Sequence, residues 1–573
     1  MNQTLFIDFE CQDPYIDEGL GAGWVFNHEG RFKVLCTAYA TEDEQVELTN
    51  SLHHLRHLVA SSTRLVAHNA QYEIGVLHAL GIPYDHLEVI DTLLLAKLFD
   101  NTLFSYGLND LAKKYLNDNK SDDGLGEVAK KLGLVKSKQQ NPVLVAKRNM
   151  NKIYEAAPDV VEEYAKQDVY LLKDLFNFYR RNLYKGVDIS FYSDLIKCLV
   201  KARARGVRVD VEKARDIRQQ LSQKIQDLKQ TIDNIAPGIN VDSSKQLSAF
   251  FDQQGIEYPL TEKGNPSITT HWLQETDHPI AQSIVRFKKY QKAARDFLDP
   301  ILDRVKPGVK YTYVHPEINI FGAAATGRAS ASNPNIQQIP KRDPEVGKLI
   351  RTIYVPHEGE TWYSLDFSSQ EPRIAVHYAA VLNAPGVETV VEMYRKNPKT
   401  DLHSEVAKMM GLSGKDGRNL AKVINLGLSY GMGIQKLADS LGVSVPKAKY
   451  YKDLYFSVAP YLEVLDLLTR KSISSKGYLT TLNGRRIRNE VGFERKALNK
   501  LIQSAAADQT WTALVHAYRS NVPILFPVHD EINISTANPE DAQKLKEIME
   551  TSTPLLVPSY TEITSGQSWG ECE

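Results

Sequence analysis

A short segment at residues 362–373 constrains the fold of this chain more than any other stretch. Its first half is aromatic and apolar and alternates in character, which predicts a β-strand. Asp366 falls where that strand would end, and a second acid, Glu371, follows it. A buried strand that brings a carboxylate to its rim can hold a metal ion, whereas an isolated Asp in this setting more often begins a surface turn. The choice between a metal site and a surface turn depends on motifs elsewhere in the chain.

The length and composition of the chain exclude several classes of protein. A chain of 573 residues is too long for one domain, and we expect roughly three or four. The net charge of -1 still permits nucleic-acid binding, because acids and bases can be segregated along the chain. We expect neither a signal peptide nor a membrane span, and the spacing of the cysteines fits a cytoplasmic protein. Four widely spaced cysteines argue against a disulfide framework and a zinc site: Cys11, Cys36, Cys198 and Cys572.

Several acidic residues in the first 185 residues lie in segments that predict strands and helices. Residues 5–10 predict a strand in which Asp8 and Glu10 share one face, and two acids on one face need a cation or an exposed edge. Residues 64–73 predict a strand that leads into a helix, with Asn69 as its cap. Tyr164 and Asp168 are four apart and would share a helix face. Together with Glu73, these residues could hold two divalent cations.

This set resembles the 3′-5′ proofreading exonuclease superfamily, with its Asp-x-Glu, Asn-x-x-aromatic-acid and Tyr-x-x-x-Asp motifs. The resemblance implies that Tyr164 positions the attacking water. It also implies four metal ligands: Asp8, Glu10, Glu73 and Asp168. Glu73 departs from the Asp that is usual in polymerase-linked members, but its carboxylate can still coordinate a cation. The segment 91–96 is similar to a helix of that fold. A retained fold without catalysis is the alternative interpretation.

Residues 186–310 predict a basic helical arm. Apolar residues from Ser193 to Asn234 follow helical periodicity, with an interruption at residues 206–210. Between Lys201 and Lys229 there are nine Lys or Arg against four Asp or Glu. Such a run is either a solvated face or a clamp for duplex phosphates. The arm resembles the thumb of family A DNA polymerases, and only short connections separate its helices, so we expect no long insertion for a processivity factor.

Residues 325–340 are almost all small and polar, which predicts a loop with outward-facing donors. Arg328, Asn335 and Gln337 could donate to minor-groove acceptors, which occur at equivalent places in every base pair. The segment resembles the family A element Thr-Gly-Arg-x-Ser-Ser-x-x-Pro-Asn-Leu-Gln-x-Ile-Pro. The resemblance implies contacts that test the shape of the duplex without determining its sequence.

The opening segment resembles motif A of the same family, Asp-Tyr-Ser-Gln-Ile-Glu-Leu-Arg. The resemblance implies that Asp366 binds both catalytic metals and that Glu371 lies under the incoming sugar and excludes a ribose 2′-hydroxyl. Pro372 stands where Leu is usual, and its ring would stiffen the following turn. By the same resemblance, His403 faces the triphosphate.

Four residues at intervals of four form one stripe on a predicted helix: Arg418, Lys422, Leu426 and Tyr430. Two cations one turn apart can bind a triphosphate, and an aromatic ring can stack near a base. An ordinary amphipathic helix has the same periodicity. The stripe resembles motif B, Arg-x-x-x-Lys-x-x-x-Phe/Tyr-x-x-x-Tyr-Gly. Leu426 departs from the usual aromatic residue and has no ring face for the nucleotide.

From Arg470 to Lys500 there are nine Lys or Arg and only two acids. This density predicts a surface for the template strand, with Arg485 and Arg486 in a turn at its middle. Some of these side chains would be merely solvated. Three residues again step by four and resemble the family helix that follows the minor groove and template: Arg495, Asn499 and Gln503.

Residues 524–532 are apolar on both sides of His529, Asp530 and Glu531. Burying three polar residues in a hairpin without a ligand would be costly. The segment resembles motif C. That resemblance makes Asp530 the second metal-binding carboxylate, places His529 near the primer terminus and gives Glu531 a supporting role.

The whole set predicts a multidomain chain of α/β and α+β class that resembles family A (Pol I-like) DNA polymerases of bacteriophage type. We expect an RNase H-like 3′-5′ exonuclease domain followed by a right-hand polymerase with an antiparallel palm sheet and helical thumb and fingers. No 5′ nuclease domain is expected. The expected boundaries are exonuclease 1–185, thumb 186–310, palm 311–374 and 496–573, and fingers 375–495.

The resemblance implies template-directed addition of dNTPs to a primer 3′-hydroxyl, with proofreading, in phage DNA replication in the host cytoplasm. Two Mg²⁺ per active site are expected, with Mn²⁺ as a substitute, and the partners are primer–template DNA and dNTPs acting on a monomer. One alternative is a 3′-5′ exonuclease whose C-terminal half only clamps DNA. Another is a non-enzymatic single-strand binder. Paired carboxylates and cations that would face phosphate argue against both alternatives.

Overall fold

The computed structural model describes residues 3–42, 44–118, 123–137, 139–261, 263–341, 343, 345–429, 431–489 and 492–572. The chain folds into two compact units. The first contains residues 1–206, 315–333 and 363–564, and the second contains residues 207–314, 334–362 and 565–573. Among the described residues no helix has the length and apolar character needed to cross a membrane.

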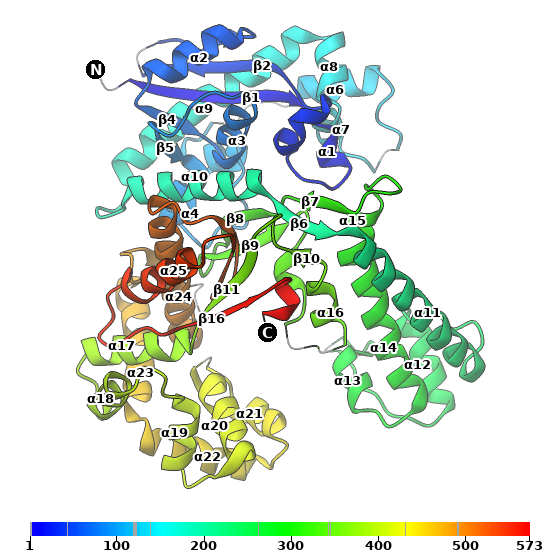
Figure 1. Ribbon diagram of the computed structural model, residues 1–573, viewed down its shortest axis with the longest axis vertical. Helices are drawn as coiled ribbons and strands as arrows, with labels where there is room; N and C mark the ends of the chain where they lie inside the picture. Colours follow the sequence, from blue (N-terminus) through cyan, green and yellow to red (C-terminus); the bar gives the residue numbers. More distant parts are fainter. Residues whose placement is uncertain are drawn as a thin grey trace. The chain divides into compact units, whose positions relative to one another are not determined.

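The first unit begins with a five-stranded sheet in the order β3-β2-β1-β4-β5 (Figure 1). Its strands are β1 Thr4–Gln12, β2 Lys33–Ala40, β3 Glu47–Thr49, β4 Arg64–Ala67 and β5 Glu88–Asp91. Strand β1 is antiparallel to β2 and parallel to β4, and its register with β2 shifts between Glu10 and Cys11. A bulge at this point turns the backbone directly after the two predicted metal ligands of β1.

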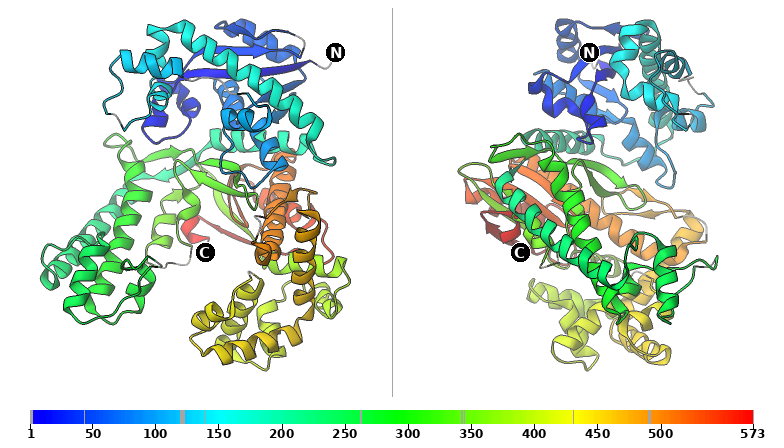
Figure 2. Two further views of the ribbon diagram at one scale, coloured as in Figure 1. Left: turned by 180° about the vertical axis from the view of Figure 1, so that it is seen from behind. Right: turned by 90° about the vertical axis from the view of Figure 1, so that its right-hand side faces the viewer.

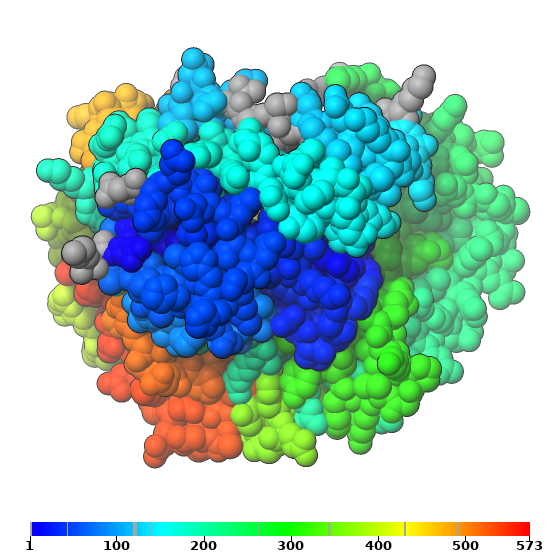
Figure 3. Space-filling view, turned by 90° about the horizontal axis from the view of Figure 1, so that it is seen from above, coloured from blue at the N-terminus to red at the C-terminus, as the bar shows by residue number. Residues whose placement is uncertain are grey.

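Helices pack against this sheet, and their apolar faces form its core with Phe6, Val66 and Ile90. The helices of this region are α1 Pro14–Asp17, η1 Gly23–Glu29, α2 Leu52–Ser61, α3 Gln71–Ala79, α4 Thr92–Phe99, α5 Leu108–Tyr115, α6 Asp123–Lys131, α7 Pro142–Arg148, α8 Met150–Ala156 and α9 Pro158–Asn182, and those from α4 onwards supply the helical residues of that core. Figure 3 shows the blue N-terminal residues side by side with the cyan segment. The fold thereby joins β1 to α9, which is far away in sequence.

The predicted cap at Asn69 is wrong. Helix α3 begins at Gln71 after Ala70, and Asn69 has a left-handed φ of 67°. Its backbone N–H donates to Asp91 Oδ1 at 2.9 Å, and Asp91 caps helix α4 through Leu93 N at 2.8 Å. An Asn tolerates the left-handed conformation that this turn needs, so the residue type fits a turn as well as it fits a cap.

A second sheet of the first unit has the order β14-β15-β11-β16. Its strands are β11 Thr361–Phe367, β14 Ile524–Val528, β15 Glu531–Thr536 and β16 Thr561–Gly566. The strand predicted around Asp366 is β11, and it lies between β15 and β16 (Figure 1). Helices α24 Ala497–Arg519 and α25 Pro539–Thr551 pack on one another, and α25 contacts β15.

Two hairpins complete this region: β8 Glu317–Ala323 with β9 Arg328–Ser332, and β12 Leu479–Thr480 with β13 Arg486–Ile487, which η4 Glu494–Lys496 follows. The loop predicted for residues 325–340 is therefore partly wrong, because residues 328–332 form β9. The small side chains of this strand let it lie against α24, and Ala331 is buried.

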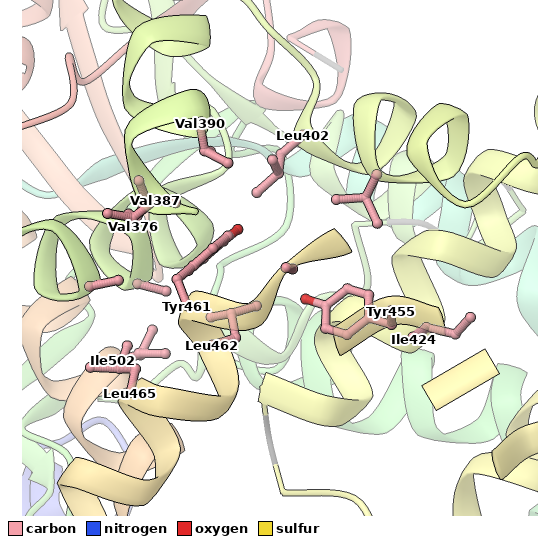
Figure 4. Close-up of a cluster of buried hydrophobic side chains, with 14 of the residues drawn as sticks. Val376, Val387, Val390, Leu402, Ile424, Tyr455, Tyr461, Leu462, Leu465 and Ile502 are labelled. Atoms are coloured by element: carbon pink, nitrogen blue, oxygen red, sulfur yellow. The ribbon is translucent and has the colours of Figure 1, made fainter. Parts of the chain in front are cut away.

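Seven helices, together with residues of α24 such as Ile502, form the apolar cluster drawn in Figure 4. They are α17 Gln370–Val381, α18 Val387–Lys396, α19 Leu402–Met409, α20 Gly414–Ser429, α21 Ile434–Leu441, α22 Val445–Val458 and α23 Pro460–Lys476. Tyr455 and Tyr461 point their rings into the cluster from α22 and α23 (Figure 4). The cluster gives helix α20 a buried apolar side through Ala421 and Ile424.

The second unit is mainly helical, and its helices α11 and α14 pack along each other (Figure 2). Its elements are β6 Val207–Asp210, α11 Val211–Ile235, α12 Ser244–Gln253, α13 Thr270–Glu275, α14 Pro279–Ala293, η2 Ala294–Leu298, α15 Asp299–Leu302, β7 Tyr311–Val314, η3 Ile336–Gln338, α16 Gly347–Arg351, β10 Tyr354–Val355 and η5 Trp569–Glu571. Strand β6 is the predicted interruption, and Gly206 before it has a φ of 72°.

Helix α10 Ile189–Arg205 belongs to the first unit, where it packs on β5, α3 and α24, although we expected it to lie with the helical arm. The helix packs there through apolar side chains that are almost fully buried, among them Leu195, Ile196 and Leu199. The division into exonuclease, thumb, palm and fingers at the boundaries given above stays a prediction.

Candidate active sites

Asp366 lies near the end of β11 and Asp530 directly before β15, so both are at one end of the two central strands of the second sheet. The backbone N–H of Phe367 on β11 donates to the carbonyl of Asp530 at 3.1 Å. Asp530 and His529 form the turn of the β14–β15 hairpin, in which His529 has a left-handed φ of 56°. Both aspartates are half-buried. Two carboxylate-bearing residues from distant segments therefore lie on adjacent backbone, as oxygen ligands for a hard cation require.

Buried polar side chains near this end of β11 and β15 form hydrogen bonds with one another. The Ser364 hydroxyl donates to Asn533 Oδ1 at 2.6 Å, and the Asn533 amide donates to Glu531 Oε1 at 2.9 Å. Glu531 and Asn533 are 3% and 0% exposed. A buried carboxylate needs such a donor, and Asn533 supplies it to Glu531 within β15. Sequence analysis missed Ser364 and Asn533, whose alternation with apolar residues is the signal that they face one another.

Glu371 and Pro372 lie in the first turn of α17, which follows Ser369 with a φ of 54°. The first four N–H groups of a helix have no intrahelical acceptor, so the missing N–H of Pro372 costs no hydrogen bond there. This position explains the proline. Arg328 from β9 forms an ion pair with Glu371. The sequence analysis gave these residues separate roles, Arg328 at the DNA minor groove and Glu371 at the sugar of the incoming nucleotide.

Helix α20 carries Arg418, Lys422 and Leu426, as predicted, whereas Tyr430 lies outside the described residues. Arg418 Nε is 2.5 Å from Asp401 Oδ2. Burial raises the pKa of Asp401, but hydrogen bonds from Ser404 and Arg418 outweigh burial and leave that pKa below its usual value. An acid thus holds Arg418 at the start of α19, and the guanidinium is still 41% exposed.

His403 is buried beside this helix, and burial lowers its pKa to about 4. The imidazole is therefore neutral at pH 7. Its Nδ1 lies 3.2 Å from the amide nitrogen of Asn425, which donates to it, and the Tyr455 hydroxyl donates to Asn425 Oδ1 at 2.6 Å. Asn425 and Tyr455 fix the ring and its tautomer. Sequence analysis did not identify either residue.

Leu426 lines a small pocket together with Glu371, Pro372 and Tyr461. We expect Leu426→Phe to raise the single-turnover rate of dNTP incorporation by about two- to tenfold, because a ring adds roughly 0.5–1.5 kcal/mol of packing beside a sugar. The ratio of dNTP to ddNTP incorporation should shift with it. Rapid-quench incorporation of both nucleotides measures this, and an unchanged ratio would show that residue 426 does not sense the sugar.

The predicted DNA contact of Arg485 is not at the surface. Arg485 is 5% exposed, and its Nε is 2.5 Å from Asp508 Oδ1 on α24. A buried guanidinium needs such a partner, and Asp508 lies beyond the window in which a basic run is recognised. Arg486 is half-buried between the rings of Tyr184 and Tyr478, 4.7 and 4.4 Å from their centroids.

We expect Arg485→Ala to destabilise the protein by about 3–5 kcal/mol, because it leaves Asp508 buried without its cation. Arg486→Ala is the matched control and should cost only about 1–2 kcal/mol, the order of two cation–π contacts. Thermal unfolding midpoints compare the two variants. Equal midpoints of the two variants would contradict the buried role of Arg485.

The remaining predicted DNA contacts occupy different elements. Asn499 and Gln503 are half-buried on α24, whereas exposed Arg495 belongs to η4 and is not on the helix itself. Only two of the three residues expected on one helix face are therefore on the helix, and the third lies in the turn before it. Asn335 and Gln337 are half-buried at η3 of the second unit.

A cluster of acids lies where β1 meets α9. Carboxylate oxygens of Asp8, Glu10 and Asp168 all lie within 4.8 Å of one another. Carboxylates at such separations repel unless a cation or a proton is shared, and hard divalent cations prefer oxygen ligands. Tyr164 is one turn before Asp168 on α9, and Lys147 Nζ is 5.2 Å from its ring centroid.

Glu73 is outside this three-residue group, on helix α3. It is 4% exposed, and burial together with the charge of Asp8 raises its pKa well above the usual value. Glu73 thus lies near Asp8, one acid of this group. Asp91, which caps α4, has its pKa raised to about 6 by burial. Sequence analysis counted Asp91 only as part of a helix-forming segment.

Comparison with known proteins identifies the family of this chain. A model of DNA polymerase family A matches residues 211–571. The chain belongs to DNA polymerase family A. Its reaction is therefore template-directed DNA synthesis, and members of this family use divalent metal ions.

Several relatives extend beyond the matched segment. The chain is 30% identical to a DNA-directed DNA polymerase of Pseudomonas phage M6 over 88% of this chain and 83% of that protein. It is 26% identical to DNA polymerase DpoZ of Acinetobacter phage SH-Ab 15497, over 87% and 86% of the two chains. The POL domain of Pol1 from M. smegmatis, solved with DNA primer-template and dNTP, has the same fold, with a TM-score of 0.80, 22% identity, and coverage of 100% and 96%.

Proposed function

We propose that this family A polymerase extends a primer at a site built on Asp366 and Asp530, with two Mg²⁺ ions as cofactors. The observation that supports the proposal is the backbone hydrogen bond between Phe367 and Asp530, which holds the segments that carry the two aspartates side by side. When bound, the cations supply positive charge that lowers the pKa of the primer 3′-hydroxyl and stabilises the departing pyrophosphate. Mn²⁺ has the same ligand preference and could substitute.

In this proposal, side chains of helices α17, α19 and α20 bind the nucleotide. Arg418 and Lys422 neutralise the triphosphate from one face of α20, and neutral His403 donates to it. Glu371 excludes a 2′-hydroxyl, and Leu426 packs against the nucleotide; Tyr430 would follow on the same stripe. Asp401 and Asn425 support this role, because they hold Arg418 and His403 before substrate arrives.

Residues 1–185 form, in this proposal, an RNase H-like 3′-5′ exonuclease that proofreads the primer end. The tight cluster of Asp8, Glu10 and Asp168 supports metal binding there. Glu73 is the fourth acid, and Tyr164 orients the attacking water. Strand β1, which carries Asp8 and Glu10, pairs with β2 and β4 inside the sheet, and such a rigid element can hold metal ligands in place.

The duplex is proposed to contact residues from several elements: Arg328, Asn335, Gln337, Arg486, Arg495, Asn499, Gln503 and His529. Residues 207–310 would act as the thumb. The protein would work as a monomer on primer–template DNA and dNTPs in the host cytoplasm during phage replication. The identity with phage polymerases supports this setting.

Primer extension tests the proposal. A 5′-labelled primer on a longer template should lengthen with dNTPs and Mg²⁺, and a single-stranded primer should shorten from its 3′ end without dNTPs. Shortening without any dNTP-dependent extension would support a nuclease with a non-catalytic clamp. Binding without either reaction would leave only a single-strand binder.

A further inference from the structure

Three consecutive carbonyl groups in the turn between β8 and β9 each accept a hydrogen bond from a different element. Asn101 Nδ2, in the loop after α4, donates to Ala325 O at 3.3 Å. Arg485, before β13, donates to Thr326 O at 3.4 Å, and Trp511 Nε1 on α24 donates to Gly327 O at 2.9 Å. The turn is thus fixed from three sides.

The three donors are shielded from water. Asn101, Arg485 and Trp511 are 5%, 5% and 2% exposed. A buried donor without an acceptor costs about 1–3 kcal/mol, so the single indole N–H of Trp511 favours the position of the turn at which its bond forms. Asn101 also donates to Arg488 O at 3.4 Å and Arg485 to Ser504 O at 2.9 Å, so these two side chains bind the turn as part of a wider network. Gly327 has a φ of 75°, and a Cβ there would lie 2.4 Å from the Arg485 guanidinium. The close approach of arginine and backbone requires this glycine.

Arg328 follows this turn directly and forms its ion pair with Glu371 on α17. The position of its Cα is set by the residue before it, Gly327, whose carbonyl Trp511 holds. Asn101 also accepts from Arg488 N at 2.8 Å, so one side chain near the N-terminal sheet binds both the turn and the segment after β13. These bonds join the N-terminal region to Arg328 through the three residues of the turn, Ala325 to Gly327.

We propose that Asn101, Arg485 and Trp511 are positioning residues for Arg328, and that they set its reach toward the primer terminus and the incoming sugar. This inference rests on the proposed role of Arg328 in DNA contact. It makes Asn101, in the region assigned to proofreading, a determinant of DNA synthesis. Loss of one donor lets the turn move, and Arg328 then loses alignment while its own charge is intact.

A double-mutant cycle tests the proposal. Trp511→Phe keeps an aromatic ring but removes the indole N–H, and Asn101→Ala removes the amide. Each should lower single-turnover incorporation of a correct dNTP by about three- to tenfold, the order of one hydrogen bond. In an Arg328→Ala background each should lower it by less than about twofold, since the effect passes through Arg328.

Trp24→Phe is the matched control, because its buried indole N–H has no hydrogen-bond acceptor among the described residues. It should leave incorporation unchanged in both backgrounds. Equal losses from Trp511→Phe with and without Arg328 would overturn the positioning role and indicate a general structural effect. If Arg328→Ala alone left incorporation unchanged, the proposed DNA contact of Arg328 would fail instead. Thermal midpoints of all variants identify any that are unfolded at the assay temperature.

Discussion

Replacing Asp366 with alanine should lower the rate of primer extension at least about 1000-fold, because a metal site supplies several kcal/mol of transition-state stabilisation. Degradation of single-stranded DNA by the same variant should stay within about twofold of the unsubstituted protein, since distant sites act independently. Asp366 belongs to β11, whereas the other acidic cluster lies on β1 and α9. Single-nucleotide extension by rapid quench measures the first effect.

Glu562→Ala is the control for this variant, because Glu562 is an exposed acid on the neighbouring strand β16. It removes a carboxylate from the same sheet and should leave extension unchanged. Extension by the Asp366 variant at more than about one-tenth of the original rate would show that this carboxylate does not hold a catalytic metal.

The combined substitution Asp8→Ala and Glu10→Ala should abolish 3′-5′ degradation, with a loss of at least about 1000-fold, and leave extension within about twofold. The two residues supply two of the three carboxylates that approach within 4.8 Å. Release of mononucleotides from a labelled single strand measures the loss. Glu163→Ala is the matched control, because Glu163 is exposed on α9 next to Tyr164. Undiminished degradation by the double variant would show that these two carboxylates do not form the nuclease site.

Local periodicity predicted the elements of both sites well. Strand β11, helix α20, the interruption at β6 and the hairpin at His529 and Asp530 all follow from patterns within about ten residues. These patterns report only which face of an element is buried. The family resemblance supplied the pairing of Asp366 with Asp530, which periodicity cannot give because the two segments are distant in sequence.

Long-range polar contacts account for what the sequence did not predict. A run of bases around Arg485 has the composition of a DNA-binding surface, yet Asp508 pairs with that arginine in the interior. Ala325 to Gly327 look like an open turn, but Asn101 and Trp511 bind its carbonyls. Such bonds depend on the packing of several elements, and no local window contains both partners.

The most direct measurement uses one 5′-labelled primer–template for both substituted proteins, each with and without dNTPs, in the presence of Mg²⁺. Two separate sites predict that Asp366→Ala only shortens the primer, and that Asp8→Ala with Glu10→Ala only lengthens it. Equal loss of lengthening and shortening in both proteins would contradict two independent active sites in this chain.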